Sequence, residues 1–267
     1  MPETDLDLAR FFTGLGLLWG VAILNQGARY VLSAGVVSLL IARIPALRRR
    51  RLQNEAPSPG QVLRELHASL SAVAILALFV VPVGVAYFAG HTRIYRDPRE
   101  YGLAYLALSF PLLLLIHDAY FYWTHRWLHR PGIYRRLHRR HHESRTPTAW
   151  AALAFHPLES VIQGAIYPVI AFALPVHLLV LAAFLVWATF HSALIHSGHD
   201  PFLADRGPRW LRWLLGAARA HDAHHASGRG NYALYFDWWD VWCGTRRPSV
   251  PTHATVSAAR AERQEHP

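Results

Sequence analysis

Histidines recur at helical spacing in three short stretches of the chain. HRWLH holds a pair four residues apart, and HRRHH and HDAHH each hold a triplet spaced i, i+3, i+4. Side chains three and four residues apart lie on one face of a helix, so each stretch can direct two or three imidazole rings to a common point. The histidines of these stretches are His125, His129, His138, His141, His142, His221, His224 and His225.

These imidazoles point to metal chemistry. Imidazole is a neutral ligand that suits iron, zinc, copper and nickel. The single cysteine, Cys243, excludes an intrachain disulfide and any cysteine-based zinc or iron–sulfur site. Eight imidazoles exceed the four ligands of one tetrahedral ion. The pattern therefore predicts an all-histidine or histidine-plus-carboxylate site for two metal ions.

Other histidines and acids lie near these stretches. His196 and His199 follow an apolar segment with i, i+3 spacing and could complete the site. His117 and His191 lie within apolar stretches, where a histidine of the structural core is an equal alternative. Six further residues are candidates for additional metal ligands or for groups that orient the ligand rings, namely His117, His156, His191, His199, Asp118 and Asp222. An isolated histidine such as His67 is expected to take no part.

Long apolar stretches must position these residues. The hydrophobic fraction is 52%, whereas charged residues make up only 16%. Segments 71–90 and 103–123 are each long enough to cross a membrane, and 161–195 suits a hairpin of two helices divided at 174–177. Residues 11–44 form either one tilted span or a hairpin. The pattern predicts an all-α integral membrane protein with about four spans.

The charge distribution predicts how the chain lies in the membrane. The formal net charge is +10, and all 27 basic residues are arginine. Most of them flank apolar segments, which favours contact with a membrane surface over binding to nucleic acid. The four arginines at 48–51 are expected in the cytoplasm by the positive-inside rule. Because an even number of spans separates the histidine stretches, all of them are expected on the cytoplasmic face.

Several motifs occur in a familiar order over residues 117–245. They are HDAYFYWTHRWLH, LHRRHHES, AFHPLES, HSGHD, HDAHH and NYALYFDWWDVWCGT. They resemble the fatty acid hydroxylase/sterol desaturase superfamily of membrane di-iron oxygenases, whose pattern is HxxxH, HxxHH and a later HxxHH. By this resemblance the clustered histidines and His196 are metal ligands. The chain departs from the family pattern at His199, where an aromatic residue is usual, and at Ala233, where glycine is common.

The resemblance also implies an architecture and a reaction. The architecture is a four-helix membrane base with a cytoplasmic helical cap that holds two iron ions, which zinc can replace in purified protein. The reaction is O2-dependent hydroxylation or desaturation of a C–H bond in a lipid of sterol or fatty-acyl type. The aromatic residues 120–123 and the apolar hairpin either wall a tunnel for this lipid or form an ordinary interface belt.

Electrons for this reaction must come from outside the chain. The sequence has no dinucleotide-binding fingerprint, no cysteine set and no haem motif. We therefore expect a ferredoxin or a cytochrome, with its reductase, to dock on the protein. Arg135, Arg136, Arg139 and Arg140 either attract such an acidic carrier or bind anionic lipid.

Two other functions fit parts of the pattern. A divalent-metal transporter would place histidines and acids at mid-membrane depth, whereas these triplets lie outside the expected spans. A zinc hydrolase on the same scaffold would need no electron donor. The favoured interpretation is one membrane-embedded domain over residues 1–250 in the inner membrane of a bacterium, followed by a disordered tail at 251–267.

Overall fold

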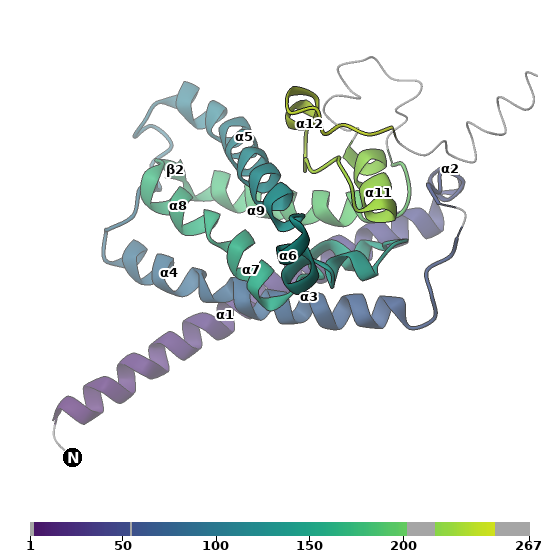
Figure 1. The fold of residues 1–267 in the computed structure, drawn as a ribbon. Helices are drawn as coiled ribbons and strands as arrows, with labels where there is room; N and C mark the ends of the chain where they lie inside the picture. The colour runs from purple at the N-terminus through teal and green to yellow at the C-terminus, as the bar shows by residue number, and fades with distance from the viewer. Residues whose placement is uncertain (1–2, 54, 202–216, 249–267) are drawn as a thin grey trace, which may run out of the picture.

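Long apolar helices dominate the fold. The computed structural model describes residues 3–53, 55–201 and 217–248 (Figure 1). Four stretches are long and apolar enough to cross a membrane, namely Arg10–Arg43, Gln61–Phe88, Leu103–Leu128 and Leu178–Ile195. This number agrees with the sequence-based expectation of about four spans. The expected tail at 251–267 lies outside the described residues.

The first apolar segment forms one helix rather than a hairpin. Helix α1 (Glu3–Arg43) runs without interruption through Asn25 and Gly27. Its N-terminal half projects away from the other helices in Figure 1, whereas its C-terminal half packs against α3 and α9. Tyr30 and Ala34, both 0% exposed, belong to the core that this packing forms. The residues Asn25, Gln26 and Gly27 were the reason to consider a hairpin. They lie within the continuous helix, so its backbone hydrogen bonds satisfy their N–H and C=O groups.

Proline divides two of the apolar stretches. The span predicted at 71–90 begins earlier and is split into α3 (Gln61–Leu78) and α4 (Val80–Phe88). The break falls four residues before Pro82, whose ring clashes with the carbonyl of residue i−4 and whose nitrogen cannot donate to it. The same reason divides α7 (Pro157–Gly164) from α8 (Ile166–Ala173), where Pro168 follows Gly164 by four residues.

The remaining apolar segments agree with the sequence only in part, because the first arm of the predicted hairpin, Pro157–Ala173, is shorter than the four candidate spans. Helix α5 (Leu103–Leu128) contains the segment predicted at 103–123 and extends it to the first histidine pair. The hairpin consists of α7 and α8 in one arm and α9 (Leu178–Ile195) in the other, and it turns at 174–177 as expected. At this turn β2 (Val176–His177) pairs in parallel with β1 (Ile94–Tyr95), so a two-residue strand pair adds to the all-α expectation.

Short helices and turns fill the end of the molecule that carries the histidines. They are α2 (Pro45–Arg48), α6 (Pro131–Ile133), the π-helical turn η1 (Tyr134–His138), the 3-10 turns η2 (His141–Glu143) and η3 (Ala149–Leu153), α11 (Ala217–Ser227) and α12 (Trp238–Trp242). Helix α11 packs against α9 (Figure 1). Together these elements form the cap that the family resemblance implies.

The turn η3 inserts between three of the long helices. The Tyr30 hydroxyl on α1 donates to the Trp150 carbonyl at 2.8 Å, and the Ser69 hydroxyl on α3 donates to the same oxygen at 2.9 Å. The Ser192 hydroxyl on α9 donates to the Ala152 carbonyl at 2.8 Å. These bonds satisfy backbone carbonyls that would otherwise be buried without a partner. The turn therefore fixes the membrane helices relative to the histidine-bearing segments beside it.

Candidate metal centre

Nine histidines come together in two groups. One group consists of His125, His129, His138, His142 and His224, and the other consists of His141, His196, His221 and His225. Within each group, one ring nitrogen from every residue lies within 4.8 Å of the corresponding atoms of the others. The groups are adjacent, because the His142 ring stacks on the His225 ring with 4.8 Å between centroids. Every histidine expected as a ligand is therefore in one of the two groups.

Each HxxHH triplet is divided between the groups. His138 and His142 belong to the first group, whereas His141 belongs to the second. The HDAHH triplet is divided in the opposite sense, with His224 in the first group and the other two histidines in the second. Each triplet therefore brings two of its three rings to a common point, which lies within the sequence-based expectation of two or three. On the α-helix that carries HDAHH, residues i and i+4 point in similar directions, whereas residue i+3 is turned about 100° from residue i+4 around the helix axis, toward the neighbouring group.

Different local structures carry the three histidine stretches. The first pair lies at the end of α5, with His125 in its last turn and His129 at its C-cap. The HDAHH triplet lies on the α-helix α11, as its spacing predicts. The predicted helical face for HRRHH is wrong, because His138 ends the π-helical turn η1 and His141 begins the 3-10 turn η2. Such irregular turns occur often at functional sites, where they redirect side chains.

The closest contacts in both groups join Nε2 atoms. His142 Nε2 lies 3.2 Å from His138 Nε2 and 3.1 Å from His224 Nε2. In the second group, His221 Nε2 lies 2.9 Å from His196 Nε2. Metal–nitrogen bonds of about 2.0–2.1 Å separate the ligand atoms of one ion by about 3–4 Å. The observed separations therefore match those of imidazoles around an ion.

Backbone carbonyls fix the protonated nitrogen of several rings. The rings whose Nδ1 lies within hydrogen-bond distance of a carbonyl oxygen are His125, His196, His224 and His225. The distance is 2.8 Å from His125 Nδ1 to the Tyr232 oxygen. Because a carbonyl only accepts, Nδ1 carries the proton and Nε2 presents a bare lone pair. Lone pairs that converge without a cation repel one another, so the donor set of both groups fits bound metal ions.

Burial keeps these imidazoles in the form that binds metal. Loss of solvent lowers the pKa of His129 to about 2, with a further contribution from the neighbouring His125. Burial likewise lowers the pKa of His196 to about 4. A pKa in this range leaves the ring neutral near pH 7, and the neutral imidazole is the metal ligand.

Sequence analysis missed Glu159. Its Oε1 lies 2.7 Å from His138 Nδ1, and both side chains are 1% exposed. A carboxylate that accepts from the second nitrogen of a ligand histidine fixes the ring orientation and raises its basicity. Glu159 is the acid of the AFHPLES motif and lies in the first turn of α7. The motif was recognised, but only the packing of α7 beside η1 reveals its partner.

Two other candidate histidines make local contacts outside both groups. His199 Nδ1 lies 2.9 Å from the Ser197 carbonyl oxygen. His156 Nδ1 accepts a hydrogen bond from the Leu158 backbone N–H at 3.3 Å and so caps the start of α7. These contacts account for the two rings without a metal ion.

His117 and His191 lie on the membrane helices beside Tyr235. His117 Nδ1 lies 2.9 Å from the Tyr235 hydroxyl, and the His191 ring lies 4.8 Å from the Tyr235 ring between centroids. Asp118 Oδ1 accepts from the Tyr235 backbone N–H at 2.7 Å. These residues thus hold the segment after α11 against α5 and α9, apart from the two histidine groups.

Asp222 connects α11 to the segment after α2. Its Oδ1 accepts a hydrogen bond from Gln53 Nε2 at 2.9 Å. Burial raises the pKa of Asp222 to about 6, and the hydrogen bond from Gln53 opposes this rise. The carboxyl group therefore anchors the helix that carries three histidines, and it lies outside both groups.

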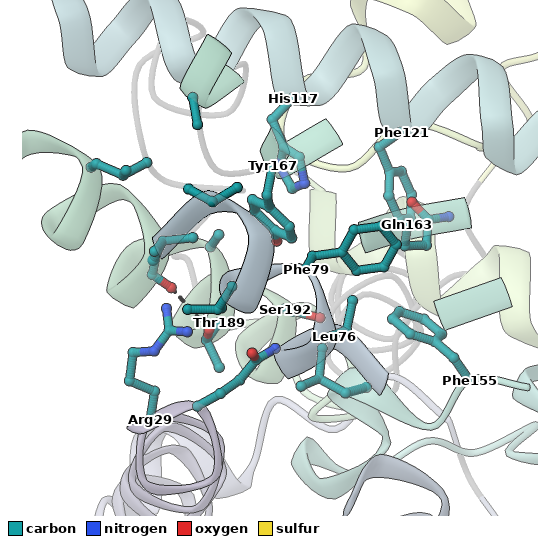
Figure 2. A pocket seen from close by; sticks show the side chains of 18 of the residues that line it. Arg29, Leu76, Phe79, His117, Phe121, Phe155, Gln163, Tyr167, Thr189 and Ser192 are labelled. Carbon is teal, nitrogen blue, oxygen red and sulfur yellow. Dashed lines mark hydrogen bonds between the residues drawn. The ribbon is translucent and has the colours of Figure 1, made fainter. Parts of the chain in front are cut away.

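An apolar cavity lies between the membrane helices, and two of its lining side chains contact one histidine of each group. It has a volume of about 200 Å³ and is lined by residues of α1, α3, α4, α5, α7, α8 and α9 (Figure 2). Phe121 in its wall lies 5.0 Å from the His125 ring, and Phe155 lies 5.3 Å from the His141 ring, both between centroids. Of the aromatic residues 120–123, Phe121 lines the cavity and Trp123 is 51% exposed on the surface.

Comparisons with known proteins identify the family. The family model described as Fatty acid hydroxylase matches residues 110–245. The chain belongs to this family. It is 30% identical over 236 residues to Delta(7)-sterol 5(6)-desaturase ERG3B of Gibberella zeae, a match that covers 86% of this chain and 72% of that relative.

Two further relatives extend the comparison. The chain is 30% identical over 233 residues to Delta(7)-sterol 5(6)-desaturase erg3C of Aspergillus fumigatus, covering 76% of this chain and 70% of the relative. It is 31% identical over 183 residues to lathosterol oxidase of Homo sapiens, covering 68% and 60% respectively. No solved structure matches the chain. These findings make the protein an O2-dependent lipid oxidoreductase and decide against the metal-transporter alternative.

Proposed function

We propose that the chain is a membrane di-iron oxygenase that hydroxylates or desaturates a sterol or fatty-acyl lipid with electrons from outside the chain. The observation that carries the proposal is the convergence of nine histidine ring nitrogens in two adjacent groups. An apolar cavity lies beside them, and its lining residues Phe121 and Phe155 contact one histidine of each group. The printed names of the relatives, sterol desaturases and a lathosterol oxidase, support a lipid substrate of sterol type.

The histidines and their supports have separate tasks in this proposal. The first group provides up to five ligands to one ion, and the second group provides four to the other. When bound, the two ions supply the redox chemistry that activates O2. Glu159 holds the proton on His138 Nδ1 and so keeps its Nε2 directed at the first ion. Iron is the natural metal for O2 chemistry at imidazole sites, and zinc would occupy the same ligands without redox activity.

The overall reaction balances only with an external reductant. Hydroxylation replaces a C–H bond by C–OH, sends the second oxygen atom into water and consumes two electrons and two protons. Desaturation removes two hydrogen atoms from adjacent carbons and sends both oxygen atoms into water with the same two electrons and two protons. Phe121 and Phe155 line the cavity beside the histidines, where they would exclude bulk water from the reacting carbon.

Both histidine groups are assigned to the cytoplasmic face. Asp200 connects them to the four arginines at 48–51, because its backbone N–H donates to the Arg50 carbonyl at 2.9 Å and its Oδ2 lies 3.8 Å from Arg50 Nη1. The positive-inside rule places such an arginine run in the cytoplasm. A donor protein would then dock over the exposed arginines next to His138 and His141, namely Arg135, Arg136, Arg139 and Arg140.

An isotope experiment tests the proposal. Iron-loaded protein in membranes is supplied with a ferredoxin, its reductase, NADPH and ¹⁸O2, and the lipids are analysed by mass spectrometry. Label in a lipid hydroxyl group supports hydroxylation, and a new double bond without label supports desaturation. Lipid turnover that continues without O2 and reductant would contradict the proposal and favour a zinc hydrolase. Zinc-loaded protein is the matched control and is expected to be inactive.

A further inference from the structure

The cavity holds a cationic side chain that forms no ion pair within the described part of the chain. Arg29 lies on α1 within the span Arg10–Arg43 and lines the cavity. In Figure 2 its side chain rises from α1 toward the cavity interior. Its Nε is buried without a hydrogen-bond partner, and no ion pair of Arg29 occurs among the residues that the structure describes. None of the described residues that line the cavity carries a carboxylate.

A guanidinium group in this position needs compensation. Charged side chains within membrane spans are costly, and they are usually paired with an opposite charge or face a functional cavity. The guanidinium group cannot lose its proton at physiological pH, so neutralisation by deprotonation is not an available route. An anionic group on a bound molecule that enters the cavity would supply this compensation.

The two ends of the cavity differ in chemistry. On one side of the cavity Arg29 of α1 lies near Thr189 of α9, whereas Phe121 and Phe155 lie on the other side (Figure 2). At the histidine end, Phe121, Phe155 and Ser192 line the cavity, and the Ser192 carbonyl oxygen lies 2.7 Å from His196 Nδ1. Between these ends the lining is mainly apolar. A ligand that matches this arrangement has an anionic head, an apolar body and a reacting carbon remote from the head.

A carboxylate fits the head position best. Guanidinium and carboxylate groups are planar and can form two parallel hydrogen bonds, which is the preferred recognition geometry of arginine. A phosphate-bearing lipid with two acyl chains is a poor match for a cavity of about 200 Å³. We propose that Arg29 binds the carboxylate of the lipid substrate and that the substrate is an acidic lipid. This inference rests on the proposed function and names the substrate class of the same site.

Gln163 provides a second polar contact nearer the histidines. It is 7% exposed, and its Nε2 has no hydrogen-bond partner. Figure 2 shows it close to Phe121, on the opposite side of the cavity from Arg29. An amide N–H at this place donates to an oxygen atom on the apolar body of the ligand. The two residues thus define both a head position and a position along the body.

Ligand binding tests the inference without any turnover. Purified protein is titrated with the fluorescent fatty acid cis-parinaric acid and with its methyl ester, which removes the charge but keeps the chain. The acid is expected to bind about tenfold more tightly than the ester. In Arg29→Met this preference is expected to disappear through weaker binding of the acid, while the affinity for the ester stays within about twofold. Arg43→Met, an exposed arginine on the same helix, is the matched control and should retain the preference.

Displacement experiments separate two sources of the carboxylate. A saturated fatty acid and a sterol side-chain acid each compete with bound parinaric acid, and the stronger competitor identifies the apolar body that the cavity prefers. Equal binding of acid and ester by the unmodified chain would overturn the inference, and this comparison needs no variant to fold. Unchanged acid affinity in folded Arg29→Met would overturn it as well. Tight acid binding without any O2-dependent oxidation would retain the Arg29 site and contradict the proposed oxygenase.

Discussion

The histidine centre and the apolar cavity are built in different ways. The centre depends on directional contacts, such as the 2.8 Å bond from His125 Nδ1 to the Tyr232 carbonyl oxygen. The cavity is formed by side chains that pack between helices. Most of these side chains are apolar, so their contacts do not depend on the direction of a hydrogen bond. Substitutions in the centre should therefore abolish chemistry at once, whereas substitutions around the cavity should alter affinity and selectivity by degrees.

Removal of a ligand histidine is expected to have the largest effect. His141→Ala or His224→Ala takes one imidazole from the second or first group, and we expect loss of detectable turnover together with a lower metal content. The measurement is metal analysis by mass spectrometry alongside the lipid assay. His67→Ala, which changes an exposed histidine on α3, should leave both values unaltered. Full metal occupancy in either ligand variant would contradict the assignment of the groups.

Loss of the Glu159 carboxylate should weaken the centre without dismantling it. Glu159→Gln removes the charge that holds His138 Nδ1, and partners of this kind commonly contribute about 10–100-fold to metal affinity. We expect a decrease of that order in a competition assay with a metal chelator. Glu143→Gln, an exposed acid on η2, is the control. Equal metal affinities in the two variants would remove Glu159 from the site.

A bulkier residue at position 164 should reduce the cavity and spare the centre. A Cβ atom on Gly164 would lie 2.5 Å from Phe79 Cε2 and 3.0 Å from Leu76 Cδ2, and both of these side chains line the cavity. Gly164→Ala is therefore expected to push Phe79 inward, to destabilise the fold by about 1–3 kcal/mol and to lower turnover several-fold at unchanged metal content. Gly35→Ala, which has open space around its Cβ, should have little effect on turnover. Loss of metal in Gly164→Ala would contradict this separation of the two regions.

Changes on the exposed arginine surface are expected to have the smallest effect. Replacement of Arg135 and Arg136 by glutamine weakens attraction for an acidic donor protein, because exposed charges act mainly on the rate of association. We expect a few-fold higher KM for the donor, a flatter dependence of the rate on ionic strength and an unchanged kcat. A lower kcat with a constant KM for the donor would place these arginines in another role.

Local spacing identified the histidines that come together in the structure, because such spacing depends only on residues close in sequence. The i, i+4 pairs in HRWLH and the two triplets needed no knowledge of packing, and His196 followed from its place after an apolar segment. The division of each triplet between two groups could not be predicted, since it depends on how α11 faces η1 and η2. The contact of Glu159 with His138 was missed for the same reason, because it forms only where α7 packs beside η1.

The membrane helices show the same limit. Hydropathy located the spans, but it left residues 11–44 ambiguous because a polar tripeptide can end a helix or be tolerated within one. Proline positions explain the breaks after Leu78 and Gly164, although the sequence analysis did not use them. The insertion of η3 between α1, α3 and α9 depends on distant hydroxyl groups such as that of Tyr30, which no local pattern marks.

The exchange of histidines between the triplets has a consequence for how the protein is made. Each group contains at least one residue from the segment 125–142 and at least one from α11, which follows in the chain all the helices that line the cavity. Neither ion position is therefore complete in a partly synthesised chain, and both become complete when α11 packs against α9. If the two groups bind the ions proposed above, a nascent chain cannot carry a fully liganded ion before the helices that line the cavity have been made.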